Sequence, residues 1–156
     1  MKKFFIIIAF FIGLTFNLNA ETKRIVSGNV NAKITIIAYE SLTCSHCADF
    51  HKEVYPKLKK DYIDTGLAKI EFRHFPLDIA ALNASKIAQC KQDQSLKILE
   101  SLYSNQQAWV KGNTIEEVNE NLKKFLQNEG FNIDFEKCIN DKDIEDFVLN
   151  DRVEGT

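Results

Sequence analysis

The chain has 156 residues, of which 45% are hydrophobic and 27% charged, as expected for a single globular domain. Its 20 basic and 22 acidic residues give a net charge of −2, which argues against nucleic-acid binding through a basic surface. Six glycines and two prolines exclude collagen-like and low-complexity classes. The composition therefore favours a folded domain that binds no nucleic acid.

The first twenty residues depart from this average. Lys2 and Lys3 precede an apolar run over residues 4–16, and a short polar stretch then ends at Ala20. This three-part layout is typical of a secretory signal peptide, so we predict a signal peptide over residues 1–20. A membrane-spanning helix needs roughly 20 apolar residues, and an uncleaved N-terminal anchor is the alternative interpretation. We therefore expect an exported chain.

The mature part begins with a predicted βαβ unit. Residues 21–32 are polar and we expect them to be irregular, whereas residues 33–40 form a β-branched apolar run that predicts a strand buried on both faces. A helical pattern follows, with one face formed by Cys47, Phe50, Val54 and Leu58.

This predicted helix is interrupted and then followed by a second strand. Pro56 should kink the helix because it has no N–H to donate to the carbonyl of residue 52, and Gly66 should end it. Residues 68–75 alternate well enough for a strand that ends before Pro76. A strand, a helix and a strand in this order predict two parallel strands.

The rest of the chain has helical periodicity. Apolar faces recur along residues 78–150, and Thr114 with Glu117 forms a capping box ahead of one helix that Gly130 should end. Asp134 is placed to cap a short helix that contains Cys138. We therefore expect a helical subdomain over residues 78–150, appended to the βαβ half-sheet.

The most informative tetrapeptide is Cys44-Ser45-His46-Cys47, just after the first predicted strand and in the first turn of the helix. Unpaired N–H groups and the helix dipole favour an anion there, so the Cys44 thiol should lose its proton more easily than a free thiol. A protonated His46 would add a positive charge beside the thiolate. In this interpretation Cys44 exchanges disulfides with a substrate, and Cys47 faces the helix and resolves the mixed disulfide.

Other interpretations of these residues remain open. The tetrapeptide could form a purely structural disulfide, or Cys44, Cys47 and His51 could hold a metal ion. We interpret His74 as an ordinary half-buried histidine and Trp109 as a core residue rather than part of a ligand platform.

From Gly28 to Leu77 the sequence resembles the DsbA-like thioredoxin-fold disulfide oxidoreductases of bacterial envelopes. The similar stretches are KITIIAYES, LTCSHCADFHKEVYPKLKKDYIDTG and FRHFPLD, and Ser45 stands where the family usually has proline. The resemblance implies an α/β, thioredoxin-like domain over residues 21–77 with a helical insertion over residues 78–150. It also implies a redox-active Cys44–Cys47 disulfide, tuned by Ser45 and His46, with no bound cofactor and no metal.

Two further expectations rest on the same resemblance. Some similar proteins carry a second, non-catalytic disulfide in the helical subdomain, for which Cys90 and Cys138 are the candidates; two free buried thiols are the alternative. Residues 151–156 end in Val153-Glu154-Gly155-Thr156, which resembles the segment ahead of the family's cis-proline. Because neither that proline nor the closing ββα unit follows, we expect a truncated or split oxidoreductase with impaired activity.

Four functions are compatible with these residues. The first is a periplasmic oxidase that introduces disulfides into unfolded or reduced exported proteins and is reoxidised by a membrane partner. The second is a disulfide reductase or isomerase on the same fold, which a more negative potential would distinguish. The third is a metal-binding module, and the fourth is a non-functional fragment of a split gene.

Overall fold

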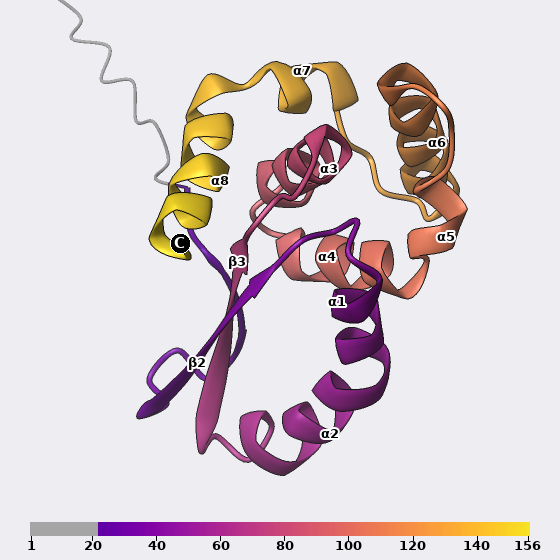
Figure 1. Ribbon diagram of the computed structural model, residues 1–156. Helices are drawn as coiled ribbons and strands as arrows, with labels where there is room; N and C mark the ends of the chain where they lie inside the picture. The colour runs from indigo at the N-terminus through magenta and orange to yellow at the C-terminus, as the bar shows by residue number, and fades with distance from the viewer. Residues whose placement is uncertain (1–21) are drawn as a thin grey trace, which may run out of the picture.

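A three-stranded sheet organises the first half of the chain (Figure 1). The computed structural model describes residues 22–156, so the predicted signal peptide lies outside the described residues. The strands are β1 (Ile25–Gly28), β2 (Ile34–Glu40) and β3 (Ala68–His74), in the spatial order β1-β3-β2. The pairing of β2 with β3 is parallel, as the predicted βαβ unit requires.

The segment that we expected to be irregular contains β1. It pairs antiparallel with β3, with Ile25 opposite Phe72 and Gly28 opposite Lys69. The expectation of irregular structure was therefore wrong for residues 25–28, where pairing with β3 and burial of Ile25 and Ser27 stabilise the strand.

The predicted burial of both faces of residues 33–40 was also wrong. Ile36 and Ala38 pack against the core, but Ile37 on the opposite face is 46% exposed and Ile34 at the start of β2 is 58% exposed. Within the described residues β2 pairs only with β3, so it is an edge strand with one open side. A continuous apolar run does not by itself show that both faces of a strand are covered.

A single helical segment connects β2 to β3, but its turns are not uniform. It consists of α1 (Ser45–Asp49), the π-helical turn η1 (Phe50–Val54), α2 (Tyr55–Leu58) and a second π-helical turn η2 (Lys59–Ile63). Pro56 lies directly after the first wide turn, which is where its missing N–H requires an irregularity. The chain then turns at Gly66, whose positive φ of 78° suits the end of a helix.

Six helices follow β3, in agreement with the predicted helical part. They are α3 (Ile79–Cys90), α4 (Ser95–Ser104), α5 (Gln106–Trp109), α6 (Ile115–Asn128), α7 (Phe135–Asn140) and α8 (Lys142–Glu154). The short α5 was not predicted. Helix α8 continues past residue 150, so the first four residues of the segment 151–156 are helical.

The predicted caps are present with one change. Thr114 accepts a hydrogen bond from the backbone N–H of Glu117, and Asp134 accepts one from Lys137. The carboxylate of Glu117, however, accepts from the backbone N–H of Asn113 at 2.7 Å, one residue earlier than a regular capping box requires. Both helices therefore begin where the sequence indicates.

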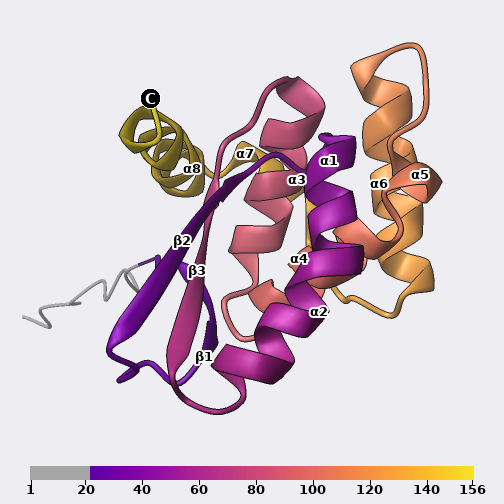
Figure 2. The same cartoon turned by 60° about the horizontal axis from the view of Figure 1, so that its bottom comes forward.

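The helical part packs on the sheet and on the α1–η2 helix, as two views show together (Figures 1 and 2). Helix α4 contacts α1 and η1, while α3 lies against α8, α7 and α6. Trp109 is fully buried, which confirms its prediction as a core residue. His74 is more buried than predicted, because its ring lies inside the structure and hydrogen-bonds to Gln89.

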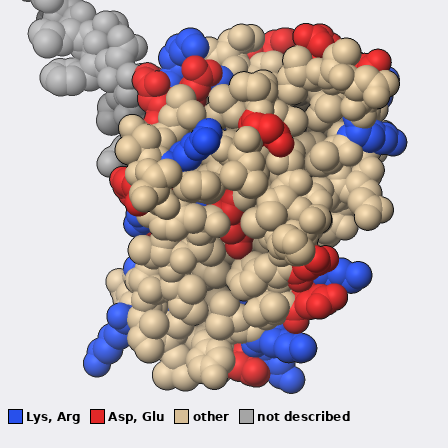
Figure 3. All heavy atoms as spheres, in the orientation of Figure 1, with Lys and Arg blue, Asp and Glu red and all other residues tan. Residues whose placement is uncertain are grey.

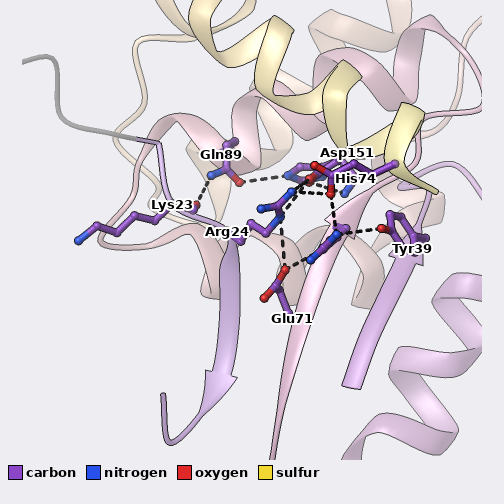
Figure 4. A network of polar contacts seen from close by, with 9 residues as sticks. Lys23, Arg24, Tyr39, Glu71, His74, Gln89 and Asp151 are labelled. Carbon is purple, nitrogen blue, oxygen red and sulfur yellow. Dashed lines mark hydrogen bonds and ion pairs between the residues drawn. The ribbon is translucent and has the colours of Figure 1, made fainter. Parts of the chain in front are cut away.

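A polar network holds α8 against the end of β3 (Figure 4). The buried Asp151 pairs with Arg24 at 3.0 Å and accepts a hydrogen bond from the backbone N–H of His74. Arg73 on β3 donates to Glu154 near the end of α8. Elsewhere charges mix: on the face drawn in Figure 3, basic and acidic side chains lie beside one another rather than in a patch of one sign.

Candidate active site

Cys44 occupies its predicted position, at the start of the helix that follows β2. It is the N-cap residue of α1, and its backbone N–H donates to the carbonyl of Ser41 at 3.1 Å, which closes a tight turn. No side chain accepts a hydrogen bond at this helix start. The N–H groups of the first turn are therefore available to stabilise a negative charge on Cys44.

Cys47 lies one turn further along and has a different environment. It packs against the hydrophobic core, and both Cys44 and Cys47 carry free thiols in this structure. Burial raises the pKa of the Cys47 thiol to about 11, a hydrogen bond with the Ser41 backbone opposes that rise, and Cys44 and the carboxylate of Glu40 add to it. Cys47 is thus protonated at neutral pH.

The two residues between the cysteines point to solvent. Ser45 is exposed, and the His46 side chain is 94% exposed, with its Nδ1 3.9 Å from a carboxylate oxygen of Asp49. A charge on so exposed an imidazole is screened by water, and Asp49 offsets it further. The arrangement therefore leaves His46 only a weak electrostatic influence on Cys44.

Beneath the tetrapeptide lies a buried acid–base pair that was not predicted. Glu40, the last residue of β2, contacts His51 at 2.6 Å between Oε2 and Nε2, and both side chains are less than a tenth exposed. The His51 ring stacks on Tyr103 with 4.0 Å between ring centres. The nearby Cys47 and Cys44 help to raise the pKa of Tyr103, after burial and Glu40, so this cluster adjoins the thiols.

One signal in the sequence could have revealed this pair. Glu40 lies two residues after Ala38 and four after Ile36, which pack against the core, and a strand's period of two directs its side chain inward as well. A buried carboxylate needs a partner, and His51 is the histidine that lies on the inner face of the following helix.

The structure does not bring together the three residues named in the metal-site alternative. The Nε2 atom of His51 is engaged by Glu40. Across residues 22–156, moreover, no group of three or more His, Cys, Asp or Glu side chains could hold a metal ion. Cys44, Cys47 and His51 therefore do not assemble into the site that their spacing allowed.

The loop before Cys44 is fixed from two sides, by residues for which no role was predicted. Thr43 donates from its hydroxyl to Asp78, the cap of α3, at 2.8 Å. On the other side, the side-chain amide of Gln106 donates to the carbonyl of Leu42 at 2.9 Å and to that of Cys44 at 3.0 Å. The helical part thus holds the active-site loop directly.

A hollow of about 570 Å³ opens beside this loop, between α1 and the α4–α5 corner. Its lining begins at Ser45 of the tetrapeptide; the other residues are Ala48, Asp49, Lys52, Tyr103, Ser104, Asn105, Gln106, Gln107 and Ala108. A chain segment joined to Cys44 would therefore have open space next to it.

The other two cysteines form a disulfide, as the resemblance implied. Cys90 at the end of α3 is bonded to Cys138 in α7, with 5.6 Å between their Cα atoms and a sequence separation of 48 residues. Cys138 is only 2% exposed. This bridge closes the helical part around its core and lies apart from the Cys44–Cys47 pair.

Comparison with known proteins is decisive for the family. A family model described as Thioredoxin matches residues 20–155. The chain belongs to the thioredoxin family. Within it the chain is DsbA-like: the crystal structure of Wolbachia pipientis alpha-DsbA1 superposes with a TM-score of 0.73 at 35% identity, over 83% of this chain and 66% of that one.

Two curated relatives agree with this placement. A Rickettsia bellii protein named "Putative protein-disulfide oxidoreductase" is 32% identical over 132 residues, covering 83% of this chain and 50% of the relative. The Bacillus subtilis disulfide bond formation protein D is 25% identical over 84% of this chain and 74% of its own length. The chain spans about half the length of the Rickettsia bellii and Rickettsia typhi relatives. Among the helices of residues 22–156, none has the length and apolar content to cross a membrane.

Proposed function

We propose that this chain is a periplasmic thiol–disulfide oxidoreductase that introduces disulfides into reduced exported proteins through Cys44 and Cys47. One observation carries the proposal: Cys44 begins a helix whose first N–H groups are free, while Cys47 packs against the core. The names of the relatives and the predicted signal peptide support the same function and location.

The reaction is a two-electron exchange in two steps. A substrate thiolate attacks the Cys44 sulfur of the oxidised pair, the Cys44–Cys47 bond breaks, and Cys47 leaves and takes up a proton. A second substrate thiolate then attacks the substrate sulfur of the mixed disulfide, and Cys44 leaves as a thiolate. The substrate dithiol is oxidised, the pair is reduced, and a membrane partner must reoxidise the pair before the next cycle.

The different environments of the two sulfurs support these roles. Ser45, the residue after Cys44, lines an open hollow, so there is space for an incoming chain segment next to Cys44. Cys47 takes up a proton readily on leaving, because burial holds its pKa at about 11. The carboxylate of Glu40 lies near enough to influence that titration as well.

Redox equilibrium with glutathione tests the proposal. The chain is equilibrated across GSH/GSSG ratios, quenched with acid, alkylated and analysed by mass spectrometry. An oxidase requires a Cys44–Cys47 potential above about −180 mV, and a value below about −250 mV would favour the reductase or isomerase hypothesis. A folded chain that oxidises no reduced substrate at all would favour the fragment hypothesis.

Two variants give matched controls for the roles of the sulfurs. Cys47→Ser should accumulate a mixed disulfide between Cys44 and a reduced substrate protein, because Cys47 can no longer resolve it. Cys44→Ser should form no such species at neutral pH, because the remaining Cys47 thiol is protonated. Equal trapping by the two variants would contradict the assignment.

A further inference from the structure

The clearest contact between the helical part and the active-site loop is made by Gln106. This residue opens α5, immediately after the corner that separates α5 from α4. Its half-buried side chain uses one nitrogen, Nε2, to donate to the carbonyls of Leu42 and Cys44, at 2.9 and 3.0 Å. Both N–H bonds of the amide are therefore directed at the loop that carries the reactive cysteine.

Both ends of this contact are anchored. Leu42 is 1% exposed, so its backbone cannot shift without disturbing the core. On the α5 side, Trp109 is fully buried and donates from Nε1 to the carbonyl of Leu102 at 3.0 Å. The Gln106 amide therefore links a buried loop backbone to an anchored helix, and it restricts the position of the loop.

The Cys44 carbonyl has a second donor that makes its orientation important. It accepts the first helical hydrogen bond of α1, from Ala48 at 3.2 Å. The amide of Gln106 and the start of the helix therefore act on one peptide plane. That plane determines how the Cys44 side chain lies relative to the free N–H groups of the first turn.

We propose that Gln106 is a positioning residue of the active site, which holds the backbone of residues 42–44 so that Cys44 ionises readily and the Cys44–Cys47 disulfide is strongly oxidising. This inference rests on the proposed function, because the position of Cys44 matters for catalysis only if Cys44 exchanges disulfides with a substrate. The positive end of the amide dipole adds to the effect, since it lies at the Cys44 backbone and favours negative charge there.

Other titratable groups near the thiols are unchanged when Gln106 is replaced, so the effect of the amide can be isolated. They come from α1, the end of β2, α4 and the start of α3: Cys47, His46, Asp49, Glu40, Tyr103 and Asp78.

The test replaces Gln106 without removing its bulk. Gln106→Met keeps the length of the side chain and loses both donors, while Gln106→Glu keeps the shape, loses donors and adds a negative charge. Gln107→Glu is the matched control, because it adds the same charge one residue away, at an exposed position outside the hydrogen bonds that hold the loop. Gln106→Ala serves if either larger variant does not fold.

Two measurements are made on the full chain. The first is the pH at which Cys44 alkylation by iodoacetamide reaches half its maximal rate, and the second is the GSH²/GSSG ratio at which half of the pair is reduced. We expect Gln106→Met to raise both quantities, the ratio by about three- to tenfold for two lost hydrogen bonds, because loss of the amide donors makes the Cys44 thiolate less stable.

The direction of the second change follows from the chemistry of the pair. A less stable Cys44 thiolate makes the reduced form less stable, so more glutathione is needed and the GSH²/GSSG ratio at half reduction rises. The pH of half-maximal alkylation and this ratio should therefore both rise in Gln106→Met, and both should rise further in Gln106→Glu. Gln107→Glu should change neither by more than about twofold.

Two results would overturn the inference. One is unchanged alkylation and redox equilibrium in the Gln106 variants, whatever their thermal stability; the other is an equal change in Gln107→Glu. Alkylation of Cys44 needs no substrate protein. A chain that oxidises no substrate would therefore refute the proposed function and leave the role of Gln106 separately measurable.

Discussion

The two cysteine pairs of this chain differ in the properties that govern disulfide chemistry. Cys90 and Cys138 lie 48 residues apart in the sequence and their disulfide joins two helices. Cys138 is only 2% exposed. Cys44 and Cys47 lie within one helical turn, and Ser45 between them lines an open hollow. The comparison teaches that the sequence separation of two cysteines and their burial decide whether a disulfide stabilises the fold or serves in thiol–disulfide exchange.

Removing the long-range bridge should give the largest effect on stability. Cys90→Ala/Cys138→Ala should lower the free energy of unfolding by about 4 kcal/mol, because the bridge restricts a long loop in the unfolded chain. Urea denaturation followed by circular dichroism measures the change. The glutathione equilibrium of Cys44 and Cys47 should stay within about twofold of the parent chain. A double variant as stable as the parent would show that the bridge does not constrain the fold.

In the Cys44–Cys47 pair, the pKa of Cys47 should respond to the charge of Glu40. Glu40→Gln keeps a hydrogen-bonding partner for His51 but removes the carboxylate that helps to raise the Cys47 pKa, so this pKa should fall below about 11, by up to about one unit. Thiolate absorbance in a Cys44→Ser background follows the titration. Glu53→Gln, which removes an exposed charge from the same helix, should leave the titration unchanged. A Cys47 pKa that rises in Glu40→Gln would show that the carboxylate stabilises the thiolate.

The smallest expected effect on stability comes from an ion pair that joins α3 and α8 in the helical part. Glu145 on α8 pairs with the buried Lys86 of α3, and hydrogen bonds from Lys86 and Lys142 lower its pKa to about 2. Because the folded-state pKa lies below the ordinary value of 4.5, this stabilisation is present above about pH 4.5 and is lost as the pH falls towards 2.

A matched pair of variants measures that contribution. Glu145→Gln should be less stable than the parent at neutral pH, by on the order of 1 kcal/mol after solvent screening, and the gap should close between about pH 4.5 and 2. Thermal unfolding across this range follows the gap. Glu136→Gln removes an exposed partner of Lys123 and should show no such closure. A gap that persists at pH 2 would contradict the link.

Local patterns predicted much of this fold. The apolar runs marked β2 and β3 within one residue at each end, and the polar residues Thr114 and Asp134 marked the starts of α6 and α7. These signals succeed because the side chains that define each element are close in sequence. The position of Cys44 at a helix start followed from the same reasoning.

Contacts between distant segments were not predictable in the same way. The strand β1 exists through its pairing with β3, and the exposure of Ile37 depends on which distant segments cover that face of β2. Gln106 lies more than sixty residues after the loop that it holds, with separations of 64 and 62 residues to its two acceptors. Nothing in the residues around Gln106 indicates those acceptors, because its role depends on how the helical part packs.

The sequence contains a single tryptophan, and it lies in the helix that opens with Gln106. Intrinsic indole fluorescence of this chain therefore arises from Trp109 alone, which is sheltered from water and three residues from the amide that holds the Cys44 loop. Emission recorded in reducing and oxidising buffers can thus be assigned to one place without labels. The molecule carries its own optical probe at the junction of its two parts.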